Sequence, residues 1–183
     1  IFSHSGGRFW NKSHTNWLES TSPICSREGI TCPNAEKDEQ VVEIDLSGFG
    51  LRGTLSSDIW ELPHLNRPKL SRNAVSIDFH GIEQAAKLTS LKLSSCHLRN
   101  LEGLLNATAS LKEVHLASNQ FEGGIQPEVL GLIYVEKLNL SNNHFSGRLP
   151  SQIGRVTSLV ELSLLDNQLT GPLPSEIGNL RNL

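Results

Sequence analysis

Branched aliphatic residues recur along the chain at a step of 23 or 24 residues. One template, L-x-x-L-x-L-x-x-N-x-L-x-G-x-I-P, describes the recurrence, and its first position falls at Val41, Leu65, Leu88, Leu111, Val135, Leu159 and Leu183. Its fourth and sixth positions are aliphatic except at Pro68. Alternation of this kind predicts a short strand with one buried face, and its recurrence predicts strands that stack in parallel. The pattern therefore predicts a solenoid.

Two further template positions carry special residues. The ninth position holds Phe49, Asn73, Cys96, Asn119, Asn143 and Asn167. A buried Asn amide can both donate and accept, so we expect it to bond the backbone of neighbouring turns, with Cys96 as a small buried substitute. The thirteenth position holds Gly53, Gly123, Gly147 and Gly171, where the chain must bend and a Cβ would hinder it.

The second and third repeats depart from the template. Residues 73–80 (NAVSIDFH) and 96–103 (CHLRNLEG) lack its Gly and Pro. Pro68 also removes a hydrogen-bond donor from a strand position. We therefore expect residues 65–110 to be the least regular part of the solenoid.

The segments 143–150 (NHFSGRLP) and 167–174 (NQLTGPLP) carry a family resemblance. Each is followed by an Ile-Gly pair, and both resemble the plant-type leucine-rich-repeat family over roughly residues 41–183. The resemblance implies an α/β fold: a right-handed solenoid, or horseshoe, with a parallel concave sheet, a second short strand and a 3₁₀ or loop convex side. It also implies non-catalytic recognition of a protein, peptide or glycan by the concave face, because similar proteins are commonly the extracellular parts of receptor-like kinases and receptor-like proteins. A co-receptor is a further partner that it implies.

The register divides the chain into an N-terminal cap and a row of repeats. We place the cap at residues 1–40 and the repeats at 41–64, 65–87, 88–110, 111–134, 135–158 and 159–182, with a seventh beginning at 183. The chain begins at Ile1, contains no Met and stops in mid-pattern, so we interpret it as a fragment. Any kinase or membrane segment would then lie beyond Leu183.

The cap needs apolar residues to cover the first coil, and Trp10, Trp17, Leu18 and Ile24 supply them. Cys25 and Cys32 enclose six residues, a spacing that a disulfide can close, with a contribution of roughly 2–2.5 kcal/mol. The alternative, half of a metal site, lacks the close Cys pairs and further ligands that zinc requires. Residues 17–32 resemble the cap of the family, although Arg27 stands where a Trp is expected. A disulfide would imply an oxidising compartment, outside the cell or at its surface.

Charge and hydropathy exclude two classes of partner. The net charge of -3 lacks the basic excess of a general nucleic-acid binder. No window approaches the roughly 18 consecutive apolar residues of a membrane span. Contact with a membrane would require segments outside this chain.

Signals for catalysis are weak. Residues 48–53 (GFGLRG) match the G-x-G-x-x-G pattern of dinucleotide sites, but that pattern must lead into a helix, and the register assigns these glycines to the first coil. The sequence also lacks G-x-S-x-G, a Walker loop, the kinase signature set and histidines at metal-ligand spacing. We expect no enzyme activity, no metal and no cofactor.

The outward strand positions carry a cluster of cations in the second and third repeats. Its members are Arg67, Lys69, Arg72 and Lys92, with His115 in the fourth repeat beside them. At about 4.8 Å between strands, the cluster matches the footprint of a carboxylate, a sulfate or a short acidic peptide. The alternative is that a polar sheet face must carry some charges without binding anything.

Three sequons, at Asn11, Asn106 and Asn139, suggest glycosylation. Their number is close to chance, so the count decides nothing. Asn106 lies in an expected loop, whereas Asn139 would point outward from the sheet. Two other functions stay open: a secreted enzyme inhibitor or adhesive matrix protein, and an intracellular repeat domain in which Cys25 and Cys32 are reduced.

Overall fold

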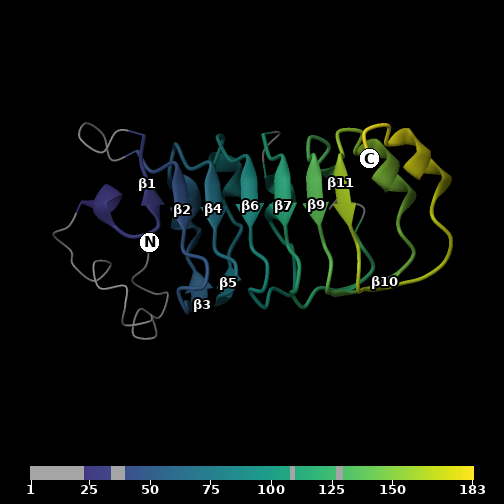
Figure 1. The fold of residues 1–183 in the computed structure, drawn as a ribbon, viewed down its shortest axis with the longest axis horizontal. Coiled ribbons are helices and arrows are strands. Elements are labelled where there is room, and N and C mark those ends of the chain that lie inside the picture. The colour runs from purple at the N-terminus through teal and green to yellow at the C-terminus, as the bar shows by residue number, and fades with distance from the viewer. Residues whose placement is uncertain (1–22, 34–39, 108–109, 127–129) are drawn as a thin grey trace.

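A row of parallel strands forms one face of the molecule. The structure, a computed structural model, describes residues 23–33, 40–107, 110–126 and 130–183. Seven strands make the main sheet in the order β1 (Ile30–Thr31), β2 (Glu43–Asp45), β4 (Arg67–Lys69), β6 (Ser90–Lys92), β7 (Glu113–His115), β9 (Lys137–Asn139) and β11 (Glu161–Ser163). They stand side by side in Figure 1. All are parallel except β1, which pairs antiparallel with β2, so the predicted parallel solenoid is confirmed.

The core lies behind this sheet because alternate strand residues point inward. The middle residue of each strand from β2 to β9 is buried, and so is the sixth-position leucine of those coils. In β11 the corresponding Leu162 and Leu164 are only partly buried. Each coil therefore covers the apolar face of its neighbour, which is the source of stability in a solenoid.

Shorter strands form a second layer at the lower edge of Figure 1. There β3 (Arg52–Leu55) pairs with β5 (Ala74–Ile77), and β10 (His144–Gly147) lies between β8 (Glu122–Gly123) and β12 (Gln168–Leu169). The thirteenth-position glycines bend the chain here, with φ between 75° and 91°. Only glycine adopts such angles without strain, which explains the template residue. The segment 48–53 runs through the turn into β3, and no helix follows it directly.

Short 3₁₀ helices complete the coils: η3 (Ile24–Ser26), η4 (Ser57–Glu61), η5 (Ile82–Gln84), η6 (Leu104–Asn106), η8 (Ser151–Arg155) and η9 (Ser175–Asn179). Their apolar residues, such as Ile59 and Ile153, are buried against the core. Trp60 stacks on Phe79 of the next coil with ring centroids 6.0 Å apart. Within the described ranges, no helix has the length and apolarity needed to cross a membrane.

The cap contains the expected disulfide. Cys25 and Cys32 are joined with a Cα–Cα distance of 5.8 Å, which confirms the predicted pairing. The bridge holds η3 beside β1, and β1 covers the edge of β2 that would otherwise be unpaired. The cap residues Trp10, Trp17 and Leu18, and the sequon residue Asn11, lie outside the described residues.

The ninth-position amides connect successive coils as predicted. The Oδ1 atom of Asn119 accepts from the backbone N–H groups of Cys96 and Leu98 in the preceding coil, both at 3.0 Å. Its Nδ2 atom donates to the carbonyls of Leu93 at 2.9 Å and Leu116 at 3.0 Å. Asn73, Asn143 and Asn167 make corresponding bonds. The ladder thus pairs backbone groups that the turns would otherwise bury unsatisfied.

The expectation of an irregular second repeat was only partly correct. Pro68 does disturb the main sheet. Only one residue pair, Lys69 with Lys92, is in register between β4 and β6, whereas three pairs are in register between β2 and β4. The second layer nevertheless keeps the full strand β5 in this repeat. Its Gly and Pro are dispensable because Val75 fills the core and Ala74 N–H still bonds Leu51 C=O.

Irregularity concentrates in the third repeat, where Cys96 replaces the ladder amide. The described residues 97–103 contain no strand. Cys96 is buried and its thiol donates to the carbonyl of Leu70 at 3.2 Å, in place of an amide N–H. Burial raises the pKa of this thiol to about 11, so it stays protonated at neutral pH. One coil earlier, the Oδ1 atom of Asn73 accepts from the backbone N–H of Leu51. The corresponding group in the second repeat is the N–H of Val75, and the Cys96 thiol offers it no carbonyl oxygen.

Cys96→Asn should therefore stabilise the protein. The new carbonyl would accept from the buried N–H of Val75, a gain of about 1–3 kcal/mol. Chemical denaturation measures this as an upward shift of the unfolding midpoint with an unchanged slope. Cys96→Val, which adds no acceptor, is the control and should bring no gain. Equal stability of the two variants would show that the missing carbonyl has no energetic weight.

Candidate functional site

The outer face of the main sheet, here called the sheet face, gathers most of the charged strand residues. The third template position contributes Glu43, Arg67, Ser90, Glu113, Lys137 and Glu161, one from each strand from β2 to β11. The fifth contributes a second row of Asp45, Lys69, Lys92, His115, Asn139 and Ser163. Register pairs place members of each row next to one another, as with Lys69, Lys92 and His115. In the fifth-position row, the side chains are therefore charged in the first three repeats and neutral in the last two.

Two members of the predicted cationic cluster are held by carboxylates of the first repeat. Arg67 Nε lies 2.8 Å from Glu43 Oε2, and Lys69 Nζ lies 2.6 Å from Glu43 Oε1. Lys69 also lies 3.6 Å from Asp45. The hydrogen bond to Glu43 is the main reason why the pKa of Lys69 is raised. These four residues form a nearly neutral group, so Arg67 and Lys69 offer less charge to a ligand than their sequence positions suggest.

Lys92 differs from the other strand cations. Among the described residues, no carboxylate lies within salt-bridge distance of its ammonium. The nearest acidic neighbour on the next strand, Glu113, is occupied: it accepts from Ser90 Oγ at 3.1 Å and lies 3.8 Å from Lys137 Nζ. Lys92 thus presents a half-buried positive charge that the fold leaves without a counter-ion.

His115 stands directly beside Lys92 in the sheet register. Burial, aided by the charge of Lys92, lowers the pKa of His115 below its ordinary value, although Glu113 and Glu161 oppose the shift. At neutral pH the imidazole is therefore uncharged, with one nitrogen donating and one accepting. Arg72 lies in the turn after β4, with an exposed side chain and a φ of 61°.

Two polar residues continue the row beyond His115: Asn139, which the sequence placed on the outer face only as a sequon, and Ser163, which it did not single out. Asn139 pairs in register with His115, and Ser163 pairs with Asn139. The amide oxygen of Asn139 accepts from Ser141 Oγ at 2.7 Å and from its N–H at 3.0 Å, which fixes the side chain. The fifth template position was the signal that could have found them, because it reaches the sheet face in every repeat.

The sequons lie in different settings. Asn106 is exposed at the end of η6, away from the main sheet. Asn139 lies on the sheet face, half-buried beside His115. A glycan on Asn139 would cover the polar row, whereas one on Asn106 would leave it open.

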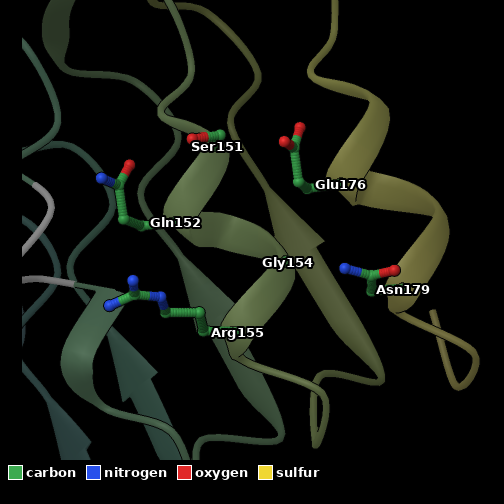
Figure 2. Close-up of a pocket in the computed structure, with 6 residues that line it drawn as sticks. All are labelled: Ser151, Gln152, Gly154, Arg155, Glu176 and Asn179. Carbon is green, nitrogen blue, oxygen red and sulfur yellow. The ribbon is translucent and has the colours of Figure 1, made fainter.

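A cleft of about 240 Å³ between η8 and η9 is the main alternative site. Figure 2 shows that its side chains do not converge: Gln152 and Arg155 project from one flank of η8, while Asn179 is directed at Gly154 from the other. Gly154 is buried, and a Cβ there would lie 2.6 Å from the Glu176 carbonyl, so close packing of the two helices explains this surface. Within the described residues, no group of three or more His, Cys, Asp or Glu side chains could hold a metal ion.

The repeats match a known family. The family model for the Leucine Rich Repeat matches residues 134–156 and 158–180, and the other coils share their strand, ladder and turn geometry. The chain is a leucine-rich-repeat solenoid. Its disulfide fits the cysteine cap that accompanies such repeats.

Solved structures of plant proteins resemble this protein over most of its length. The Arabidopsis receptor kinase HAESA, in complex with the peptide hormone IDA and the co-receptor SERK1, is 30% identical with a TM-score of 0.83, covering 94% of this chain and 29% of that chain. The BIR3–SERK2 complex from Arabidopsis thaliana is 28% identical with a TM-score of 0.53, covering 87% and 73%. A plant ice-binding protein, 24% identical with a TM-score of 0.73, covers 90% and 54% and shares the fold. This leucine-rich-repeat chain spans 29% of the length of the HAESA chain that it matches.

Proposed function

We propose that this chain is a ligand-recognising part of an extracellular, receptor-like protein, and that its sheet face binds an anionic peptide without catalysis. Lys92 would contact a carboxylate or sulfate of the ligand. One observation carries the proposal: Lys92 is a half-buried strand cation with no counter-ion, at the centre of a polar row. A peptide that supplies the missing anion gains a charge-assisted hydrogen bond, which is stronger than a neutral one.

The chemistry of the row suits a peptide lying across the strands. The ammonium of Lys92 has three donors and His115 adds a donor and an acceptor. Asn139 and Ser163 continue with neutral polar groups, which can pair with peptide amides. The step of about 4.8 Å between strands spaces these four residues over roughly 14 Å, the length of about four extended peptide residues.

Similarity to a receptor kinase of known structure supports the proposal. The HAESA structure is named as a receptor kinase in complex with a peptide hormone and a co-receptor, and the part of it that matches this chain is 30% identical in sequence. By that likeness we also propose a co-receptor as a second partner and the cell surface as the location. The Cys25–Cys32 disulfide supports an oxidising compartment, and the exposed Asn106 is the sequon that we propose to be glycosylated.

A steric block tests the proposal. Asn139→Trp would place a bulky side chain in the middle of the row, while Glu122→Trp would place the same side chain on β8, away from the sheet face. The probe is an acetylated and amidated Asp-Ser-Asp-Ser-Asp peptide, with calorimetry as the measurement. We expect Asn139→Trp to weaken binding at least tenfold and Glu122→Trp to leave it unchanged. Equal binding by both variants would remove the sheet face as the site.

Affinity for the same site should depend on pH through His115. Its pKa is lowered in the free protein by burial and by Lys92. A bound anion would favour the protonated imidazole, so the pKa of His115 rises in the complex and affinity increases as pH falls. Inorganic sulfate, which keeps its charge over this range, is the probe, titrated between pH 7.5 and 5. His115→Gln should flatten the dependence, and an unchanged slope in that variant would exclude the histidine.

A further inference from the structure

Glu43 occupies, within the protein itself, the position that an anionic ligand would take beside the second repeat. Arg67 Nε lies 2.8 Å from one of its carboxylate oxygens, and Lys69 Nζ lies 2.6 Å from the other. The two cations stand two residues apart on β4, so both side chains leave the strand on the same face and converge on one carboxylate. Glu43 therefore satisfies donors that a ligand would otherwise contact.

The carboxylate of Glu43 is also difficult to displace. Its side chain is 16% exposed, whereas that of Arg67 is 54% exposed. Water and salt screen an ion pair less when one partner is shielded from solvent. A ligand that took the place of Glu43 would leave a largely buried carboxylate without a partner, which is costly.

The contact between Glu43 and Lys69 isolates Lys92. Lys69 and Lys92 are register partners on adjacent strands, which are about 4.8 Å apart. Two ammonium groups so placed could share one divalent anion or bind successive anionic groups of one ligand. However, Glu43 belongs to β2, on the side of β4 away from β6, and its bond draws Lys69 Nζ in that direction. Lys92 alone keeps the free charge of this pair.

The charges of the sheet face balance as a whole. The third-position and fifth-position rows together contain four carboxylates and four Lys or Arg side chains. The face therefore has no net positive field that would concentrate a polyanion, and attraction is confined to the surroundings of Lys92. A ligand with one acidic group and neutral polar neighbours matches this distribution, since Asn139 and Ser163 continue the row.

We infer that Glu43 is a specificity-determining residue of the sheet face. It restricts the ligand to a peptide segment with one anionic group, bound at Lys92, and disfavours segments with several. A more highly charged ligand gains nothing at Arg67 and Lys69 while Glu43 holds them. The inference rests on the proposed function, because it concerns the same site.

Two acetylated and amidated peptides test the role of Glu43 by calorimetry at pH 7.5. Ser-Ser-Asp-Ser-Ser carries one carboxylate, and the acidic probe Asp-Ser-Asp-Ser-Asp carries three. The native protein should bind the acidic probe at most about threefold more tightly, which is the statistical advantage of three equivalent groups. Glu43→Gln keeps the size of the side chain and removes its charge, so Arg67 and Lys69 become available. We expect the preference to rise to at least about tenfold, the gain of one charge-assisted hydrogen bond.

Two controls identify the cause of that gain. Glu122→Gln removes an equal charge from β8 in the other strand layer, so it should keep the native preference. Combining Glu43→Gln with Arg67→Gln and Lys69→Gln should return the preference to its native value. That result separates the effect of freed cations from that of a rearranged fold.

An unchanged preference in Glu43→Gln would overturn the inference. So would a native protein that already prefers the acidic probe by more than about tenfold, because the ligand would then displace Glu43. In either case, loss of binding in Lys92→Glu would leave the proposed function standing. Binding of the peptide with one carboxylate that survives Lys92→Glu would overturn the proposed function and the inference with it.

Discussion

Asn119→Leu is expected to lower the free energy of unfolding by about 3–9 kcal/mol, the largest effect of any single substitution considered for this fold. The side chain is 6% exposed and bonds two neighbouring coils at once. Leucine fills a similar space, so the loss comes from hydrogen bonds rather than from a cavity.

Three backbone groups would lose their only partner in this variant. They are the N–H groups of Cys96 and Leu98 and the carbonyl of Leu93, whereas the carbonyl of Leu116 keeps the amide of Asn143. Each buried and unsatisfied group costs about 1–3 kcal/mol.

Chemical denaturation followed by circular dichroism measures the effect. Gln168→Leu, an exposed position in β12, is the control for adding the same side chain and should change stability by less than about 0.5 kcal/mol. A loss below about 1 kcal/mol in Asn119→Leu would mean that water replaces the amide and that the ladder is not a main source of stability.

Lys92→Glu is expected to weaken binding of the acidic probe about 100-fold. A hydrogen bond to a charged group contributes about 1.5–3 kcal/mol, which corresponds to roughly 10- to 150-fold in affinity, and the new carboxylate also repels the ligand. Lys87→Glu changes the net charge equally at an exposed position outside the strands, and it should have less than a threefold effect.

Arg67→Gln tests whether the ion pair with Glu43 makes Arg67 less available to a ligand than Lys92. The sequence gives Arg67 and Lys92 equal standing in one cationic cluster, but Arg67 is bonded to Glu43 at 2.8 Å. We therefore expect Arg67→Gln to weaken binding less than threefold. A loss as large as that of Lys92→Glu would show that the ligand displaces Glu43, and the anion site would then extend over both strands.

The period of the sequence determined the fold because every coil repeats the same physical requirements. Alternating aliphatics at the fourth and sixth positions require a strand with a buried face, and glycine at the thirteenth position permits the positive φ of 75–91° that the bend needs. Asn at the ninth position supplies donors and acceptors in one side chain, so its bonds to neighbouring coils could be predicted. The six-residue spacing of Cys25 and Cys32 similarly predicted a closed disulfide.

The tertiary structure alone decided which charges remain available, because ion pairing depends on neighbours that are 23 to 26 residues away along the chain. Glu43 satisfies Lys69 at 2.6 Å, and Ser90 and Lys137 hold Glu113, so Lys92 is left without a counter-ion. The interrupted second layer was equally hidden, since residues 73–80 and 96–103 both lack the template Gly and Pro, yet only the first forms a strand. The difference lies in contacts between coils, because Ala74 N–H reaches the Leu51 carbonyl of the preceding coil, whereas no backbone hydrogen bond joins the described residues 97–103 to β5.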